Sequence, residues 1–237
     1  MKLLRRRASS PVGSDRRIVW QAASLLLAYP DAGQADRLDT VERAISVLDA
    51  ALRDPLVAAV LHLRGTPPIE AAVQYADTFD WKRRRTLFLT YYTAGDTRNR
   101  GMALLSFSDM YRAAGVVPPA RELPDHLAVL LEFAATVDEA AGYEQLCRHR
   151  TPIDMIHDGL LKSSPIYAGV IGAVQATLPP ATLADLKEAR RLAMQGPPAE
   201  SVGLEPFALT IGMRPALSRV GATPLPTPSI GTGRKSP

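Results

Sequence analysis

The sequence predicts an all-α protein, a single-domain bundle of about ten helices, for three reasons. Apolar residues recur at three- and four-residue spacing through most of residues 15–195, which is the period of one helix face. Proline and glycine fall where such helices would begin and end. No two alternating runs are joined by a hairpin turn, so we do not expect a sheet.

The two ends of the chain differ from this body, so we divide the sequence into three parts. Residues 1–14 form a basic tail that we expect to be disordered, and residues 15–195 form the helical domain. Residues 196–237 contain eight prolines and six glycines, one third of the segment. This leaves too little apolar surface to order that tail, although one patch, residues 202–209, could dock as an extended arm.

Helix caps and spacing predict the elements of the N-terminal half. Asp15 caps a first helix that runs to Ala28, and Asp54-Pro55 starts another helix further on. Between them, one helix face carries Val41, Ile45, Leu48 and Leu52. The helix after Pro55 turns inward with Leu56, Val60 and Leu63. The next begins at Thr66-Pro67-Pro68, and its predicted inner face consists of Ile69, Val73 and Ala76.

The C-terminal half gives further helices. Residues 86–93 have strand propensity, but they lack a hairpin partner, so we predict a helix there. The following helix, which ends at Gly115, is marked by Leu104, Phe107, Tyr111 and Ala114. Pro124 opens a helix with an inner face of Leu127, Leu130, Leu131, Ala134 and Val137. Residues 143–161 form a helix that is bent at Pro152. Pro165 starts the next helix, which ends near Leu178. Thr182 caps the last predicted helix, which runs to Gln195.

Composition and charge narrow the function classes. The chain has 237 residues, 46% hydrophobic and 22% charged, as in ordinary soluble domains. No run reaches the roughly 18 apolar residues of a membrane span, so we expect no membrane insertion. Arg5, Arg6 and Arg7 precede an apolar stretch, but no cleavage site follows, so we interpret them as a basic tail rather than an export signal. The single Cys147 fits a reducing compartment, and we expect the protein to be cytoplasmic.

The positive charge lies in the tails. The net charge is +4, but residues 18–195 carry 18 Lys/Arg against 21 Asp/Glu. Nucleic-acid binders gather positive charge on the folded surface, so we expect no nucleic acid, although a surface binder that uses the basic N-terminus remains an alternative. A mildly acidic body would favour a basic ligand.

The search for catalytic or metal chemistry is mostly negative. Residues 95–101 are flanked by glycine and basic, so they form either an anion-binding loop or a polar turn between helices. Cys147, His149 and His157 do not share one helix face, so they predict no metal site but a buried cysteine and surface histidines. Asp125 and His126, at a predicted helix start, are either structural, with Asp125 at the positive end of the helix dipole, or the acid–base pair of a small-ligand hydrolase. We predict no catalytic residues.

A second cluster combines acidic and aromatic side chains ahead of the basic run 82–85: Asp77, Phe79, Asp80 and Trp81. One interpretation is a helix end with a solvated face. The other is a mixed apolar and acidic groove that suits a peptide carrying arginine and apolar residues.

Three strings in the sequence resemble a known family. They are YADTFDWKRRRTLFLTYYTAGDTRNRGMALLSFSDMYRAAG, ELPDHLAVLLEF and, later, GPPAESVGLEPF. In combination they resemble the nitrate reductase molybdenum cofactor assembly chaperones of the NarJ type, within the wider TorD-like group of molybdoenzyme chaperones. The resemblance covers about residues 17–207. Other branches of the family often carry His or Glu where this chain has Tyr91 and Tyr92.

The resemblance implies a function and a site. It implies an all-helical chaperone, not an enzyme, that binds the N-terminal segment of the apo catalytic subunit of respiratory nitrate reductase until its molybdenum cofactor is inserted. A different molybdoenzyme client, of the dimethyl-sulfoxide or formate type, is the alternative. The family motif maps onto Pro124, Asp125 and His126. We expect no resident cofactor, and a monomer or weak dimer.

We expect the peptide groove to lie between the region of residues 75–89 and the helix that begins at Asp125. The predicted peptide-binding residues are Asp77, Phe79, Asp80, Phe88, Glu122, Pro124, Asp125, His126 and Leu127. The apolar members would supply affinity, and the carboxylates would set orientation and on-rate. Charge reversal at Asp125 is therefore expected to weaken binding without unfolding the protein.

Overall fold

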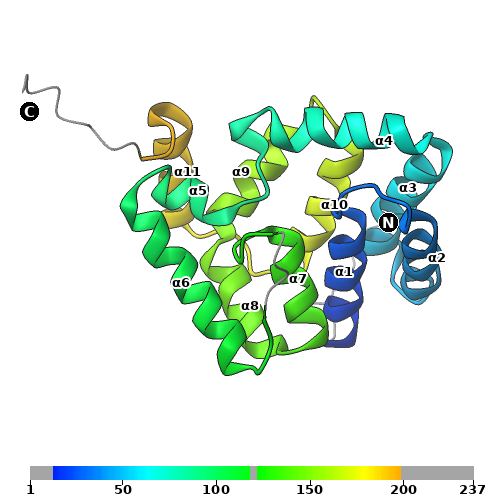
Figure 1. The fold of residues 1–237 in the computed structure, drawn as a ribbon, viewed down its shortest axis with the longest axis horizontal. Coiled ribbons are helices and arrows are strands. Elements are labelled where there is room, and N and C mark those ends of the chain that lie inside the picture. Colours follow the sequence, from blue (N-terminus) through cyan, green and yellow to red (C-terminus); the bar gives the residue numbers. More distant parts are fainter. Residues whose placement is uncertain (1–12, 118–121, 199–237) are drawn as a thin grey trace, which may run out of the picture. The chain divides into compact units, whose positions relative to one another are not determined.

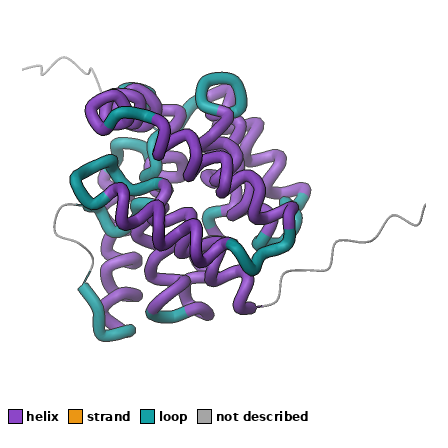
Figure 2. The backbone as a smooth tube through the Cα atoms, turned by 90° about the vertical axis from the view of Figure 1, so that its right-hand side faces the viewer, coloured by secondary structure: helices purple, strands orange, loops and turns teal. Residues whose placement is uncertain are grey.

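The computed structural model describes residues 13–117 and 122–198. These residues form eleven α-helices joined by loops and two short helical turns of other types, and they contain no strand (Figure 2). The predicted all-α class is confirmed. Every helix in these ranges falls short of the length and hydropathy that a bilayer span requires. The arm at residues 202–209 lies outside the described residues.

The helices follow one another with short connections. The first six elements are α1 (Gly13–Leu26), α2 (Gln34–Ile45), α3 (Ala50–Gly65), α4 (Pro68–Tyr75), the π-helical turn η1 (Ala76–Asp80) and the 3-10 turn η2 (Arg83–Arg85). The remaining elements are α5 (Leu89–Ala94), α6 (Arg98–Ala113), α7 (Leu127–Thr136), α8 (Glu139–Arg148), α9 (Arg150–Leu160), α10 (Pro165–Ala176) and α11 (Leu183–Gln195).

The core is centred on α1, α7 and α10. Helix α1 packs against α7, α2 and α10, and α10 packs in turn against α3 and α9 (Figure 1). Trp20 on α1 is fully buried, and its indole Nε1 donates a hydrogen bond of 2.8 Å to the hydroxyl of Thr177, just after α10. A buried indole N–H needs such a partner, so this bond helps to fix α1 on the end of α10.

Several predicted elements are confirmed. Helix α10 begins at Pro165, and α11 is preceded by Thr182, whose hydroxyl accepts from the Asp185 amide while the Asp185 carboxylate accepts from the Thr182 amide. This reciprocal capping box satisfies two amides that would otherwise lack partners. Helix α6 stops before Gly115, which has a φ of +77°, a conformation that glycine adopts without strain.

Other predicted boundaries are wrong. Helix α3 begins at Ala50 with Asp49 as its N-cap, so Pro55 lies inside the helix and not in its first turn. Val41 and Ile45 belong to α2 and Leu52 to α3, so the predicted continuous face is broken by a turn at residues 46–49. The single helix predicted for residues 143–161 is two helices, α8 and α9, which meet at His149. Pro152 does not bend a helix but lies in the first turn of α9, where a backbone N–H would have no helical partner.

The predicted inner face of α4 is also wrong. Ile69 and Val73 are 82% and 54% exposed, whereas Ala71 and Tyr75 are buried. The Tyr75 ring lies 4.9 Å from Phe79 and 6.4 Å from Tyr167, centroid to centroid. The aromatic contacts that orient α4 therefore come from η1 and α10, which the local sequence pattern of α4 does not contain.

Candidate functional site

A segment that we call the strap, residues 79–92, leads from the end of η1, just after α4, toward α6. It includes the end of η1, the turn η2, an extended stretch at Leu87 and Phe88, and most of α5. We predicted a helix for residues 86–93, but α5 begins only at Leu89, and Phe88 forms an isolated antiparallel bridge with His126. The strand propensity of these residues therefore gives an extended backbone at Phe88, because His126 supplies a backbone partner there.

That partner is the turn before α7, residues 122–126, which we call the Pro124 turn. The Leu127 amide donates to the Leu87 carbonyl at 2.8 Å, and the Leu89 amide donates to the Asp125 carbonyl at 3.2 Å. The hydroxyl of Tyr111 on α6 donates to the Pro124 carbonyl at 2.8 Å. These bonds join the two segments, far apart in the chain, that carry most of the predicted site residues.

Asp125 forms the side-chain link between the same two segments. Its Oδ2 accepts from the amide of Thr90 at 2.9 Å and from the hydroxyl of Thr90 at 2.6 Å. Asp125 is fully buried, and its Oδ1 has no partner within the described residues. Helix α7 begins only at Leu127, after its N-cap His126, so the predicted helix start at Pro124 is wrong and Asp125 lies before the helix. Its carboxylate anchors the strap instead.

A small cavity lies where the strap and the Pro124 turn meet, and we call it the acidic pocket. It encloses about 150 Å³ and is lined by Tyr29, Tyr75, Phe79, Asp80, Thr86, Leu87, Phe88, Glu122 and His126. Its walls are therefore mainly aromatic. The polar residues come from five places: the loop after α1, α4, η1, the loop after η2 and the Pro124 turn.

The two carboxyl groups of the acidic pocket are destabilised in their charged forms. Burial raises the pKa of Asp80, and burial together with the charge of Asp80 raises the pKa of Glu122. Burial also lowers the pKa of His126 to about 4, so its imidazole is neutral near pH 7. The pocket thus combines two crowded carboxyl groups with no nearby cation in its lining, and a bound cation would relieve both.

The structure separates the predicted site residues into two groups. Phe79, Asp80, Phe88, Glu122 and His126 line the acidic pocket. Asp77 is exposed and does not line the pocket, the Pro124 carbonyl accepts from Tyr111, and Asp125 and Leu127 are fully buried. A side chain with no exposed surface cannot contact a ligand, so we withdraw Asp125 and Leu127 as contact residues.

Sequence reasoning missed Tyr29, Tyr75, Thr86 and Leu87 as pocket residues. Tyr29 follows α1, and its ring lies 5.4 Å from that of Tyr75, centroid to centroid. In the sequence, Tyr29-Pro30 indicates only the end of the first helix. Nothing in the local pattern of residues 26–33 indicates that this loop reaches the strap.

The other predicted candidates do not converge. No group of three or more metal-binding side chains is present within the described residues. His149 is buried against Phe107, with ring centroids 5.1 Å apart, so the prediction of a surface histidine is wrong there. Only residues 95–97 of the stretch 95–101 form a turn, because Arg98 begins α6. Asp96 pairs with Arg100 at 3.3 Å and with Arg83 at 3.8 Å, so its carboxylate offsets part of the positive charge here.

Comparison with known proteins gives the family. A family model described as nitrate reductase delta subunit matches residues 39–158, just over half of the chain. The chain belongs to the nitrate reductase delta subunit family. The residues that match the family model include the strap, the Pro124 turn and every residue of the acidic pocket except Tyr29.

Individual relatives agree with this assignment. The chain is 46% identical over 160 residues to the nitrate reductase-like protein NarX of Mycobacterium tuberculosis, which covers 68% of the chain but only 24% of NarX. It is 29% identical over 166 residues to the probable nitrate reductase molybdenum cofactor assembly chaperone NarJ of Bacillus subtilis, covering 70% of the chain and 90% of that protein. With the Escherichia coli K12 chaperone NarJ it shares 32% over 126 residues, 52% of the chain and 53% of that relative.

Proposed function

We propose that this protein is an assembly chaperone of a respiratory nitrate reductase and that it binds the N-terminal segment of the apo catalytic subunit. Relatives named as nitrate reductase molybdenum cofactor assembly chaperones support the first part. The acidic pocket supports the second, because five of the predicted site residues line this one cavity.

The size of the acidic pocket favours a side chain over a free small molecule. Small-molecule sites usually enclose roughly 300–1,000 Å³, whereas this pocket encloses about 150 Å³. Two carboxyl groups with raised pKa values favour a cation, and aromatic walls favour an alkyl stem or a guanidinium plane. We therefore propose that one arginine or lysine of the client segment enters the pocket, while apolar neighbours rest on the exposed edges of Phe88 and Tyr29.

The structure gives no support to the alternative of a hydrolase that uses Asp125 and His126. Such a pair requires the carboxylate to orient the imidazole through a hydrogen bond. Here Asp125 Oδ2 bonds to Thr90, and neither Asp125 Oδ1 nor His126 Nδ1 has a partner among the described residues. The two side chains are neighbours in sequence without forming the catalytic arrangement, so we propose binding as the function.

The test is a calorimetric titration with a synthetic peptide from the N-terminus of the catalytic subunit of the same organism's nitrate reductase. We expect saturable one-to-one binding. The double substitution Asp80→Asn with Glu122→Gln should weaken it about 10- to 100-fold, because both partners of the cation lose their charge. Replacing the basic residues of the peptide by alanine should have a similar effect on the wild-type protein and little further effect on the double variant.

Asp77→Asn is the matched control, because Asp77 belongs to the same turn as Asp80 and is likewise exposed, but it does not line the pocket. It should leave the affinity unchanged. Binding only to a leader peptide of a dimethyl-sulfoxide or formate enzyme would change the client and keep the chaperone. Absence of binding to all of these peptides would contradict the proposed function, and binding insensitive to the double substitution would contradict the proposed site.

A further inference from the structure

A second and larger cavity, which we call the basic cleft, is lined by other residues of the strap. It encloses about 480 Å³ between η2, α5, α9 and α11, and shares no lining residue with the acidic pocket. Its apolar lining includes Tyr91, Tyr92, Met155, Leu186 and Leu192. Nothing in the proposed function uses this cleft.

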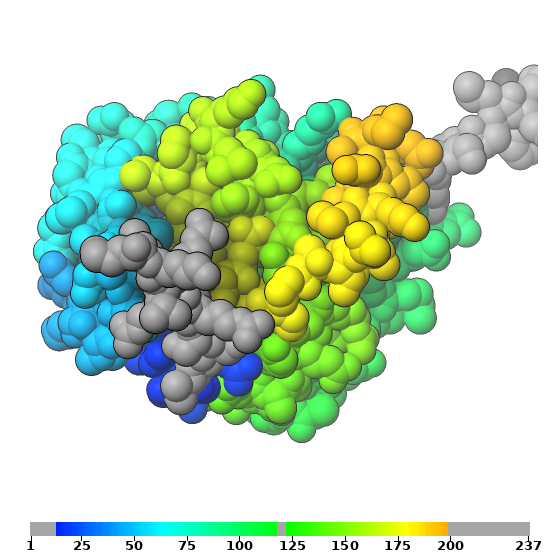
Figure 3. Space-filling view, turned by 180° about the vertical axis from the view of Figure 1, so that it is seen from behind, coloured from blue at the N-terminus to red at the C-terminus, as the bar shows by residue number. Residues whose placement is uncertain are grey.

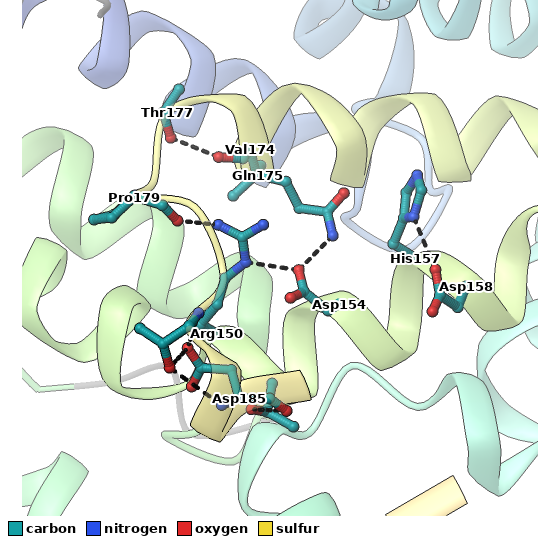
Figure 4. Close-up of polar contacts among 11 residues, drawn as sticks. Arg150, Asp154, His157, Asp158, Val174, Gln175, Thr177, Pro179 and Asp185 are labelled. Carbon is teal, nitrogen blue, oxygen red and sulfur yellow. Dashed lines mark hydrogen bonds and ion pairs between the residues drawn. The ribbon is translucent and has the colours of Figure 1, made fainter. Parts of the chain in front are cut away.

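The wall formed by α11 is held by a polar network (Figure 4). Arg150 donates through Nε to Asp154 at 2.7 Å and through Nη1 to the carbonyl of Pro179, and Gln175 donates to the same Asp154 oxygen at 2.6 Å. Arg150 and Asp154 are largely buried, with 15% and 19% of their side chains exposed. This network fixes the loop that leads into α11, so the cleft is a feature of the fold and not of a loose terminal helix.

Close packing at two glycines forms the other boundaries. A Cβ at Gly159 on α9 would lie 3.1 Å from the Arg84 carbonyl oxygen, so this glycine lets η2 lie directly on α9. Gly95, at the end of α5 with a φ of +58°, faces the backbone of Pro198, and a Cβ there would lie 1.7 Å from its carbonyl oxygen. Residues 196–198 therefore lie near the end of α5, and Gly196 and Pro197 line the cleft there.

The electrostatics of the basic cleft are opposite to those of the acidic pocket. Arg83, Arg84 and Arg190 stand on its rim with one carboxylate, Asp158. Arg84 and Arg190 are exposed, and neither forms an ion pair within the described residues. Arginines without partners at the edge of an apolar cleft would steer and orient an occupant that carries carboxylates.

The helix ends at this cleft favour a peptide over a phosphorylated small molecule. Asp158 and Gly159 lie in the last turn of α9, and Gly196 is the C-cap of α11. Helix C-termini carry partial negative charge and carbonyls without helical partners, which disfavour a phosphate on the floor but can accept N–H groups. Helix α11 is exposed along its outer side (Figure 3), with Leu183 79% and Met194 88% exposed, so an elongated occupant could extend beyond the cleft.

We propose that the basic cleft is a second docking site, for an acidic, apolar peptide segment of a partner protein. Apolar side chains of the segment fill the space over Tyr92 and Leu192, and its carboxylates pair with Arg84 and Arg190. The proposal does not depend on the function of the acidic pocket, because the two cavities have separate linings and opposite charge.

The test uses two fluorescent synthetic helical peptides of about 15 residues, or four turns, with leucines on one face and either glutamates or lysines on the other. Binding is measured by anisotropy with the full chain. The glutamate peptide should bind saturably, and the lysine peptide should bind much more weakly at this site. Reversing both rim charges, with Arg84→Glu and Arg190→Glu, should weaken the glutamate peptide at least about tenfold.

Matched variants on α11 separate docking from general effects. Lys187→Glu makes the same kind of charge change at an exposed position outside the cleft and should leave affinity unchanged. Ala189→Trp places an indole in the cleft and should abolish binding, whereas Ala184→Trp, exposed and outside the lining, should not. Thermal unfolding of each variant shows whether it is folded, and binding of the client peptide at the acidic pocket should survive Ala189→Trp.

Three results would overturn the proposal. The first is glutamate-peptide binding that Ala189→Trp and the rim reversals leave unchanged, or no binding at all. The second is binding by a chain that ends at Pro198 but not by the full chain, since residues after Pro198 would then compete for the cleft. The third is a dimer, seen by sedimentation, that Ala189→Trp dissociates, since a second copy would then be the occupant.

Discussion

The acidic pocket and the basic cleft are lined by different residues of one strap, and they differ in almost every property that decides what a cavity binds. The pocket is small, aromatic and carries two carboxyl groups, whereas the cleft is about three times larger, with arginines on its rim. One segment achieves this because Asp80 precedes the basic run and the backbone turns at η2. A short stretch of sequence can thus present opposite charges to two separate ligands.

The strap is also the point at which both sites are most easily broken. The largest expected effect comes from Asp125→Ala, which removes the acceptor of two hydrogen bonds from Thr90 and leaves that buried amide and hydroxyl without partners. We expect the free energy of unfolding to fall by about 3 kcal/mol, measured by urea denaturation. Both peptide-binding activities should weaken together, since the strap supports both cavities.

Two controls sharpen the Asp125 experiment. Asp125→Asn keeps an oxygen acceptor and should lose less stability, and Asp77→Ala, on the exposed side of η1, should change it by less than about 0.5 kcal/mol. Charge reversal at Asp125 was expected from sequence to spare the fold. Because the side chain is fully buried, we now expect Asp125→Lys to unfold the protein. A variant Asp125→Ala as stable as the wild type would show that the strap is held by its backbone alone.

A smaller effect is expected at a hydrogen bond that joins a residue of one cavity to a residue of the other. Tyr92 lines the basic cleft, and its hydroxyl donates at 3.1 Å to the carbonyl of Thr86, which lines the acidic pocket. Tyr92→Phe should cost about 1 kcal/mol of stability and weaken both peptides a few-fold. Tyr91→Phe is the control, because the Tyr91 hydroxyl makes no hydrogen bond within the described residues. Equal effects of the two substitutions would mean that this bond does not couple the sites.

The same strap shows how much the sequence could predict. Caps and prolines located α10 and α11 because those signals act within a few residues of the helix end, as Pro165 and Thr182 do. The acidic and aromatic cluster and the Pro124 turn were recognised from sequence, and the structure brings Phe79, Asp80, Phe88, Glu122 and His126 to one cavity. That this cavity binds a peptide is still a prediction.

The remainder depends on contacts between distant segments. Phe88 is extended because His126 lies opposite it, and Ile69 faces outward because Tyr75 packs on rings from η1 and α10. The basic cleft has no local signature at all, since its walls come from η2, α5, α9 and α11. The periodicity of apolar residues describes one helix at a time, so it cannot predict a cavity that four separate elements form.

The smallest predicted effect separates the two sites by pH. Burial raises the pKa values of Asp80 and Glu122 above their values in the unfolded chain, and only the charged carboxylates attract a cation. The folded protein therefore favours the protonated carboxyl groups, and their contribution to its stability is present at low pH and lost as pH rises through the raised pKa values. Binding of a basic client peptide has the opposite sense, and should weaken a few-fold as pH falls from about 7 toward the ordinary carboxyl range near 4.

The pH dependence of client binding can be assigned to Asp80 and Glu122, because the other titratable groups that line the pocket do not change charge between about pH 7 and pH 4. Burial raises the pKa of Tyr75, so it stays protonated, and His126 stays neutral until about pH 4. The double variant Asp80→Asn with Glu122→Gln should therefore bind weakly and show little change over the same range. Binding of the glutamate peptide to the basic cleft should be nearly constant down to about pH 5, because arginine does not titrate there. If both sites lose affinity in parallel, the peptides themselves or the fold are titrating, and the charge difference between the two cavities is not what selects their ligands.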